Sequence, residues 1–377
     1  MPAAAKTTSA VVAKTAKPTA RLIDRLAAAV SAQAKLQPAL GAFAAALVAQ
    51  ADPTELVNRT PAHLLAMAQA AWAHARAPRR GRAVRVQVSN PGYTYHTVAH
   101  VIMPDQPFVV DTLWLTLNRL GLEVHHTFHP VLRLTRDAQG RATAVGPASA
   151  QRDQGEEVFV HLEFDSQPDT ALATLTQALQ QALAEAQAAV EDFAAMAKRL
   201  RDYATAQAKQ VKTSQDQEYL AFVDWLLAGN FIFLGARTYD YNAARDTLQV
   251  RVGEGLGLLR QDQASSVFKP TKLAQLAPNL QKYLRGGGWL NINKGLQKST
   301  VHREGDIDFI SLKVTDNRGQ MVAEQRYIGL FTSKAYTAPV ASIPVVRQKI
   351  GQILDLERPN LGVNSHNYKA LVSILEN

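Results

Sequence analysis

The sequence predicts an α+β fold: a ferredoxin-like βαββαβ unit preceded by a helical segment. An apolar strand ends at Met103-Pro104, and a tight turn and an amphipathic helix stopped by Gly121 follow it. A second strand of matching length is expected over 122–133. A third apolar strand, 157–164, leads into a long helical stretch over 165–208. Strands that alternate with helices in this order are typical of the βαββαβ unit.

Length and composition bound the possibilities. The 377 residues suit two or three domains, and a hydrophobic content of 47% suffices for sizeable cores. The absence of cysteine excludes disulfides and thiolate metal sites and fits a cytoplasmic protein. No uninterrupted apolar run approaches the roughly 18 residues of a membrane span, so no membrane partner is expected.

The positive charge is concentrated at one end. Of the net charge of +9, residues 1–82 contribute eleven Lys and Arg against three Asp and Glu, so the remainder is nearly neutral. This distribution does not form a basic stripe along a recognition element, and we expect no nucleic-acid partner. Binding through the basic leader is the alternative, and it would be steeply salt-dependent.

The first 82 residues divide into two parts. Residues 1–20 are a leader of Ala, Lys and Thr, either disordered or a mitochondrial presequence, without a secretory core. Residues 21–82 are a helical segment and linker, in which Asp52 and Thr60 each precede a proline as helix N-caps. The basic run Arg79-Arg80-Gly81-Arg82 is either a solvated turn or a phosphate-binding element.

Two further regions follow. Residues 83–210 form the βαββαβ domain with its long connecting helix, and the alternating Val84, Val86 and Val88 add a strand before it. Residues 211–377 form a second α+β region, truncated at its C-terminus, because the helix expected over 366–377 ends without a cap. Its expected helices and strands are helices 217–228, 272–284 and 344–354 and strands 231–241, 247–252, 308–314 and 321–331.

The histidines do not predict a metal site. His96 and His100 lie in a strand-like run, where residues four apart are separated by about 13 Å. Strict alternation along a strand places His125 and His129 on one face and His126 on the other. No further ligand is evident beside them, so we expect no metal.

The glycine-rich segments do not predict a nucleotide site either. Gly253, Gly255 and Gly257 do not satisfy the dinucleotide fingerprint, and Trp289 follows Gly286–Gly288 where a phosphate-binding loop needs Lys. Both segments are expected to be loops. We expect no catalytic residue and no bound cofactor in this chain.

The turn between the first strand and the helix is the candidate binding site. Asp105, Gln106, Pro107 and Phe108 lie at a helix N-terminus, whose unpaired N–H groups and positive dipole end suit an amino-acid carboxylate. Asn118, near Gly121 at the other end, is a candidate for holding the ammonium group across a subunit interface. In the alternative, Asp105 only caps the helix.

Ordered blocks across about 290 residues resemble the N-terminal region of the large bacterial NAD-specific glutamate dehydrogenases. The blocks are Arg85-Val86, Asn90-Pro91, His96–Val98, Asp105, Pro107-Phe108, Asp111, Asn118–Gly121, His129–Val131, Trp225-Leu226, Gly229–Phe231, Phe233–Gly235, Ser299–Arg303, Gly329–Ser333, Tyr336, Ile343-Pro344, Arg347 and Lys369–Leu371. The resemblance implies ACT-like modules before a catalytic domain that is not in this chain.

The resemblance also implies a role for the chain. The parent enzyme would convert L-glutamate, NAD⁺ and water to 2-oxoglutarate, ammonium and NADH, with its NAD site outside this chain. The chain itself would be a regulatory and oligomerisation region, inactive alone, with an amino acid as effector. Phe108 stands where ACT domains usually have Gly, and its ring would fill the space a ligand needs. The alternative is a free-standing amino-acid-binding regulator.

Overall fold

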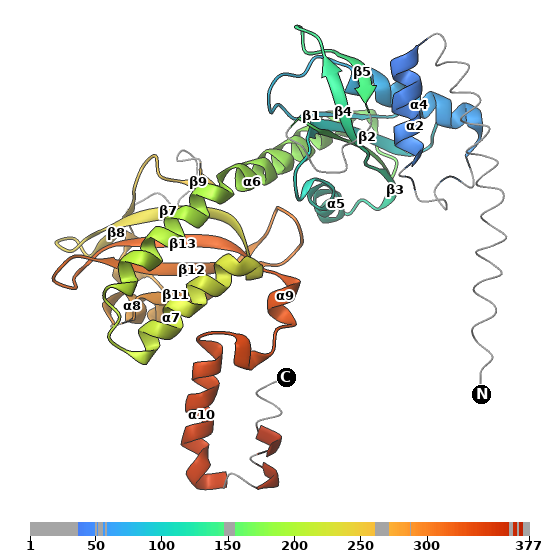
Figure 1. Cartoon of the computed structure of the whole chain (residues 1–377). Coiled ribbons are helices and arrows are strands. Elements are labelled where there is room, and N and C mark those ends of the chain that lie inside the picture. The colour runs from blue at the N-terminus through green and yellow to red at the C-terminus, as the bar shows by residue number, and fades with distance from the viewer. Residues whose placement is uncertain are drawn as a thin grey trace, which may run out of the picture. The chain divides into compact units, whose positions relative to one another are not determined.

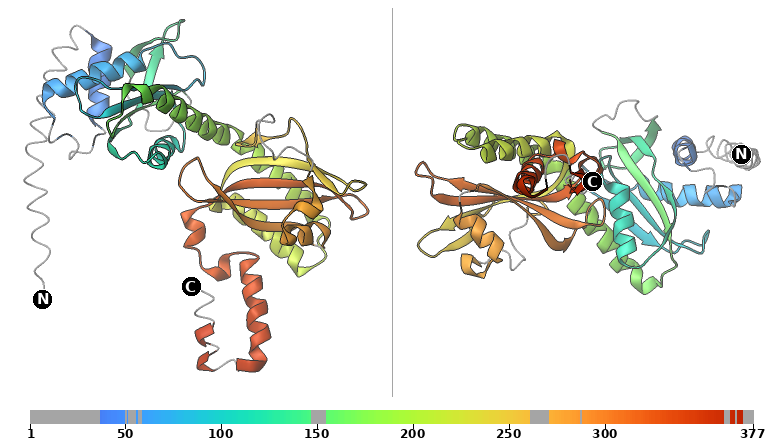
Figure 2. Two further views of the ribbon diagram at one scale, coloured as in Figure 1. Left: turned by 180° about the vertical axis from the view of Figure 1, so that it is seen from behind. Right: turned by 90° about the horizontal axis from the view of Figure 1, so that it is seen from below.

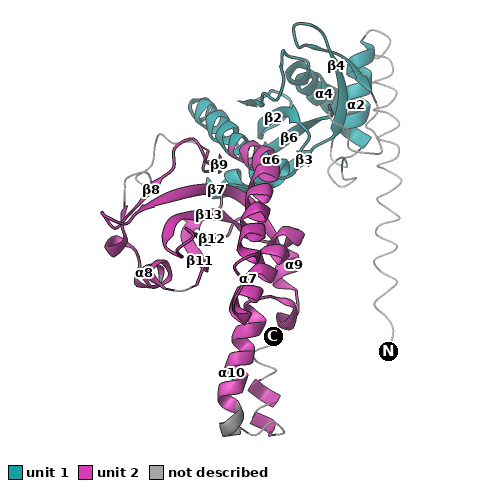
Figure 3. Cartoon of the chain, turned by 60° about the vertical axis from the view of Figure 1, so that its left-hand side comes forward, with its two compact units in different colours: residues 1–184, 300–302 teal, residues 185–299, 303–377 magenta. Residues whose placement is uncertain are grey.

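The computed structural model describes residues 37–49, 51, 56, 59–146, 155–260, 271–286, 288–361, 365–367 and 369–371. The leader over 1–20, the start of the helical segment, Asp52 and most of the helix expected over 366–377 lie outside these residues. The chain divides into two compact units, Met1–Ala184 with Thr300–His302, and Glu185–Ser299 with Arg303–Asn377 (Figure 3).

Unit 1 contains helices on both sides of one sheet (Figure 1). Its elements are α2 (Pro38–Ala49), α4 (Pro61–Ala75), β1 (Arg85–Ser89), β2 (Thr97–Pro104), α5 (Val109–Arg119), β3 (Val124–Phe128), β4 (Val131–Arg136), β5 (Ala142–Gly146), β6 (Glu157–Phe164), the 3₁₀ turn η1 (Asp169–Ala171) and the first part of α6 (Leu172–Ala208). The N-cap predicted at Thr60 is confirmed, because its side chain accepts a hydrogen bond from the backbone N–H of His63.

The sheet of unit 1 has the order β1-β2-β6-β4-β5, and β3 also pairs with β6. All pairings are antiparallel. The strand that precedes the unit, β1, lies beside β2 at the edge that the last strand of a βαββαβ unit would take. The α+β class is therefore confirmed. Because α6 continues into unit 2, none of the described strands follows it in this sheet, and β1 takes the edge position instead.

Two apolar cores lie on opposite faces of this sheet. On β6, Val158, Val160, Leu162 and Phe164 pack with α5 and α6, whereas Phe159 packs with α2 and α4. All eight residues of β6 are buried. A strand covered on both faces alternates between two cores. The predicted helical segment is thus one layer of unit 1.

The single strand expected over 122–133 is divided in two. His129 and Pro130 separate β3 from β4, since proline cannot donate to a strand ladder. In β3, Val124 pairs with Phe164 and His126 with Glu163, so His125 is an extra, bulged residue. The strict alternation expected for the histidines fails at this bulge.

Unit 2 contains one larger sheet (Figure 2). Its elements are the rest of α6, α7 (Ser214–Trp225), the π-turn η2 (Leu226–Asn230), β7 (Phe231–Asn242), β8 (Thr247–Val250), β9 (Leu256–Gly257), β10 (Thr271–Lys272), η4 (Leu273–Gln275), α8 (Pro278–Arg285), β11 (Leu290–Lys298), β12 (Asp306–Thr315), β13 (Met321–Phe331), α9 (Ser333–Tyr336), η5 (Val340–Ser342) and α10 (Val346–Leu361). The expectations missed β11, whose polar and glycine-containing sequence lacks a clear alternation.

The second sheet has the order β10-β8-β7-β13-β12-β11, with β9 beside β7. Three consecutive strands, β11, β12 and β13, form an antiparallel meander, which differs from the βαββαβ order expected for this region. The rest of α6 and α7 cover one face around Tyr203, Phe222 and Tyr327. The unit boundary falls inside α6, because Leu179 and Leu183 belong to the core of unit 1 and Leu200 to that of unit 2. The expected boundary, at 210 to 211, lies at the end of that helix.

Candidate functional site

The predicted effector turn connects β2 to α5 in unit 1. Asp105 donates its backbone N–H to the carbonyl oxygen of Glu156 at 2.9 Å. Pro107 is exposed, and Gln106 is buried, with its side-chain oxygen 3.5 Å from a guanidinium nitrogen of Arg82. The N-cap of α5 is Phe108, whose side chain makes no capping hydrogen bond. The four residues are therefore contiguous at a helix N-terminus.

Phe108 has a left-handed backbone, with φ 73° and ψ 7°. This conformation costs a non-glycine residue roughly 1–2 kcal/mol. Its half-buried ring lies 5.0 Å from the ring of His302 within unit 1. The turn therefore has the backbone that glycine adopts readily, with an aromatic ring in place of open space.

Asn118 and Gly121 lie at the opposite end of α5, and both are exposed. A helix of 11 residues spans about 16 Å. Within one chain these two residues and the Asp105–Phe108 turn are thus separated by the length of the helix. A single small ligand could contact both ends only through a second copy.

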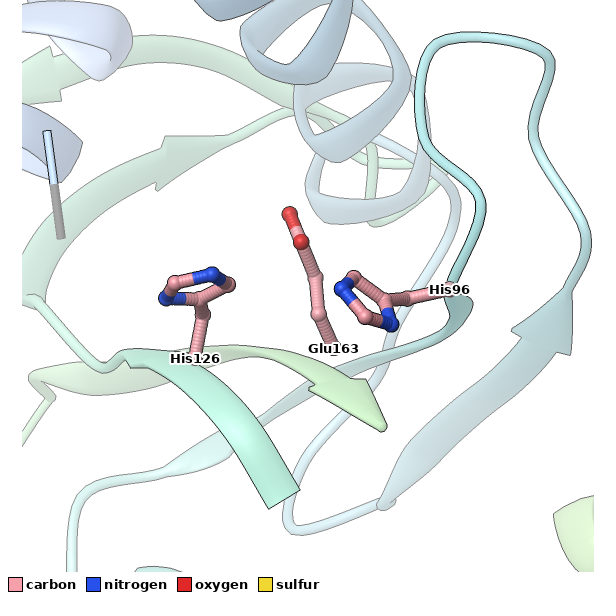
Figure 4. Close-up of side chains that lie close together, drawn as sticks. All are labelled: His96, His126 and Glu163. Atoms are coloured by element: carbon pink, nitrogen blue, oxygen red, sulfur yellow. The ribbon is translucent and has the colours of Figure 1, made fainter. Parts of the chain in front are cut away.

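A cluster that the sequence did not predict lies on the α4-facing side of the same sheet. Ligand atoms of His96, His126 and Glu163 all lie within 4.8 Å of one another. Figure 4 shows the carboxylate of Glu163 between the two imidazole rings. The ring of His125 lies 4.4 Å from that of His96, and its Nε2 lies 2.9 Å from the carboxylate of Asp165.

Glu163 is the centre of a buried network of polar side chains. Its Oε1 accepts hydrogen bonds from Arg59 at 2.7 Å and from His161 at 3.0 Å. The other ring nitrogen of His161 lies 2.9 Å from His100. Each of these four side chains is at least nine-tenths buried. This polar network joins β2 and β6 to Arg59, which precedes the N-cap of α4.

Burial and hydrogen bonding set the protonation states of the side chains in this polar network. Burial by itself would raise the pKa of Glu163, but hydrogen bonds from His161 and Arg59 outweigh it and hold the pKa well below its usual range. Burial lowers the pKa of His161 and of His100, and the neighbouring ring lowers that of His100 further. At neutral pH, Glu163 is therefore ionised and both histidines are neutral.

Comparison with known proteins assigns two segments of the chain. Residues 43–179 match the model of the glutamate dehydrogenase ACT1 domain, and residues 343–377 match that of glutamate dehydrogenase helical motif 1. The chain is 29% identical over 355 residues to the NAD-specific glutamate dehydrogenase of Pseudomonas aeruginosa, an alignment that covers 91% of this chain and 22% of that protein. These matches support an N-terminal region of the NAD-specific glutamate dehydrogenase family for this chain.

Two further NAD-specific glutamate dehydrogenases are similar to it. That of Halomonas elongata is 28% identical over 308 residues, which cover 78% of this chain and 19% of that protein. That of Mycobacterium tuberculosis is 24% identical over 280 residues, which cover 71% of this chain and 16% of that protein. The chain spans about a fifth of the length of the relatives it matches. In the described part, none of the helices is long and apolar enough to cross a membrane.

The histidine and carboxylate cluster has donor atoms close enough for a divalent ion, but one of its donors is already engaged. A tetrahedral zinc ion with ligands at about 2.1 Å needs donor atoms about 3.4 Å apart, which lies within the 4.8 Å that bounds this cluster. The guanidinium of Arg59 already neutralises Glu163 at 2.7 Å. It would also repel a second cation. The expectation that the chain binds no metal stays a prediction.

One sequence signal could have revealed the buried polar network around Glu163. His161 and Glu163 are two residues apart in an apolar strand, so they share a face, and two polar groups on a buried face require partners. Arg59 lies 104 residues away from Glu163. Local patterns carry no information on that pairing.

Proposed function

We propose that this chain is a regulatory and oligomerisation region of a cytoplasmic NAD-dependent glutamate dehydrogenase. The parent enzyme would oxidatively deaminate L-glutamate to 2-oxoglutarate and ammonium and reduce NAD⁺, and its catalytic residues and NAD site would lie outside this chain. The observation that carries the proposal is the match of residues 43–179 to the ACT1 domain of glutamate dehydrogenases.

The glycine-rich segment of unit 2 supports the absence of an NAD site from the described residues. Gly257 has a φ of 59°, and a Cβ there would lie 2.1 Å from the carbonyl oxygen of Leu234. Close packing of β9 against β7 therefore accounts for this glycine without a phosphate ligand.

Activity is the direct test of this part of the proposal. The purified 377 residues are mixed with L-glutamate and NAD⁺, and the absorbance of NADH is followed. No NADH is expected, with a full-length glutamate dehydrogenase as the positive control. Sustained formation of NADH by the purified chain would overturn the proposal.

The proposed effector is an amino acid at the turn formed by Asp105, Gln106, Pro107 and Phe108, with Asn118 and Gly121 contributed by a second copy. The N–H groups that begin α5 suit the carboxylate, and the N-cap residue Phe108 offers them no side-chain acceptor. The left-handed backbone at Phe108 is one that glycine adopts without strain, so Phe108→Gly would open the turn while keeping its shape.

Calorimetric titration with a panel of amino acids tests the effector site. Because the ring of Phe108 fills the turn, we expect Phe108→Gly to bind an amino acid at least tenfold more tightly than the unmodified chain. Asn118→Ala should weaken that binding, and Gln325→Ala in unit 2 serves as the control. Equal binding, or none, by the two proteins would remove the turn from consideration.

The proposed homo-oligomer is supported by the open faces of unit 1. Trp114 and Leu120 on α5 are 42% and 51% exposed. The edge strand β1 pairs only with β2 among the described strands. Exposed apolar side chains and an open sheet edge favour association. Sedimentation at several concentrations should reveal more than one copy, and a monomer throughout would contradict oligomerisation.

A free-standing amino-acid-binding regulator remains the second candidate. The helix N-terminus of α5 favours it equally, because that feature does not depend on a catalytic domain. Tight binding by the isolated chain together with a monomeric state would support it.

A further inference from the structure

Unit 2 contains a cleft of about 640 Å³ at one end of its sheet. The end of α6, the start of α7, the end of α8 and the turn between β12 and β13 contribute to its walls. A cleft of this size is in the range of small-molecule sites, which extends from about 300 to 1,000 Å³.

The charged side chains that line this cleft are mostly cationic. They are Lys209, Lys212, Arg285 and Lys313, with Asp216 as the single acid. Of these cations, Arg285 has a counter-charge outside the cleft lining, because it lies 2.9 Å from Asp246. The described lining therefore carries a clear excess of positive charge.

Asp216 offsets only one of these charges, and its carboxylate is already hydrogen-bonded within the protein. One oxygen accepts hydrogen bonds from the backbone N–H and hydroxyl of Thr213 at 3.0 and 2.8 Å and from the backbone N–H of Lys212 at 3.2 Å. The other accepts one from the indole of Trp289 at 3.0 Å. The acid thus serves as the capping box of α7.

Lys313 is the decisive residue. It is only 5% exposed, and its ammonium group donates to the backbone carbonyls of Tyr283 and Gly286 at 2.8 and 2.6 Å. Burial lowers the pKa of Lys313, and no carboxylate among the described residues opposes that effect. An ammonium has three donors, and buried charges in proteins are normally paired with an opposite charge. The acid opposite Lys313 in the sheet, Glu324, is engaged by Arg326. Lys313 thus lines an open cleft as a buried cation without an ion pair among the described residues.

The uncharged part of the lining is mixed. Leu284, Trp289 and Met321 supply apolar surface. Hydrogen-bonding amides and one hydroxyl are supplied by Gln207, Gln210, Asn317 and Thr315. Small-molecule sites combine apolar surface with a few polar groups that fix the orientation of the ligand. A ligand that matches this lining combines negative charges with an organic body.

We propose that this cleft binds a small organic polyanion of about the size of a nucleotide. Lys209, Lys212 and Lys313 contact its negative groups, and Trp289 packs against its body. Phosphate esters and polycarboxylates share this chemistry. The proposal rests on unit 2 alone and does not depend on the proposed function of the chain.

A purely structural role for Lys313 is the competing explanation. Its two acceptors, Tyr283 in the last turn of α8 and the C-cap Gly286, lie where a lysine stabilises the carbonyl end of a helix. That role would account for Lys313 but not for the exposed Lys209 and Lys212 beside it. The test therefore uses these two exposed lysines, whose replacement leaves the core of unit 2 intact.

The experiment titrates the full chain with ATP, pyrophosphate or citrate, and follows heat and tryptophan fluorescence. The double variant Lys209→Gln/Lys212→Gln should weaken binding at least tenfold, because it removes two charges from the rim. Lys349→Gln, at an exposed position on α10 outside the cleft, should bind as the unmodified chain does. Trp289→Phe should abolish the fluorescence change while leaving a heat of binding.

The three probes distinguish the sources of the anion. Binding of ATP and pyrophosphate assigns the cleft to phosphate esters, and binding of citrate alone assigns it to polycarboxylates. Either result supports the proposal when the double variant loses it and higher salt weakens it. Failure of all three probes at millimolar concentration overturns the proposal, as does binding that the double variant retains.

Discussion

Replacing Glu163 by Gln removes the charge at the centre of the buried polar network in unit 1 and changes the side-chain volume little. The side chains of Arg59 and Glu163 are 5% and 2% exposed. The variant leaves the guanidinium of Arg59 in the interior without the charge of Glu163 beside it. Breaking one side of a buried ion pair costs about 3–5 kcal/mol. We therefore expect the free energy of unfolding of unit 1 to fall by about that amount at pH 7.

Hydrogen exchange in increasing urea, read by mass spectrometry on peptides of β6, reports unit 1 separately from unit 2. Glu123→Gln is the matched control, because it makes the same chemical change at an exposed position of the same unit. Its effect should stay within about 0.5 kcal/mol.

A double variant tests the cause of the loss. Arg59→Met combined with Glu163→Gln removes both charges, so it should be less destabilised than the sum of the single changes by about 1–3 kcal/mol. A loss below about 1 kcal/mol for Glu163→Gln, or strict additivity in the double variant, would refute the view that this pair is coupled and buried.

Three further expectations follow from the same structure. Gly257→Ala should lower the stability of unit 2 by about 2–4 kcal/mol in urea unfolding, because its Cβ would collide with a backbone carbonyl. Gly253→Ala, also at positive φ but in open space, should cost only about 1 kcal/mol. Because burial lowers the pKa of His100 and His161, the unfolded chain binds protons before the folded one. Unit 1 should therefore lose stability as pH falls below 6.5, by up to about 1.4 kcal/mol per pH unit for each histidine, and His100→Gln should flatten that slope. Equimolar zinc should leave the melting temperature unchanged, because Arg59 already neutralises the carboxylate of the histidine cluster; a rise of several degrees would contradict this.

Local sequence patterns predicted the helices and strands that end at a glycine or at a turn sequence. The helix expected before Gly121 is α5, and Gly121 has the positive φ of 73° that ends it. The turn Asp316–Gly319 lies between the strands expected over 308–314 and 321–331 and joins β12 to β13, with the Asp316 side chain accepting from two backbone N–H groups. These features depend on residues within a few positions of one another, so the sequence carries their full cause.

Only the tertiary structure decided what the histidines and lysines contact. The bulge at His125 and the pairing of β3 with β6 bring His126 beside Glu163, a neighbour that alternation along one strand does not specify. Arg59 reaches Glu163 across 104 residues, and Lys313 meets the end of α8 through sheet packing. The sequence by itself determined periodicity, caps, turns and family resemblance, because these are local or cumulative properties. The partners of buried charges follow from which faces of distant elements meet, and only the folded chain decides that.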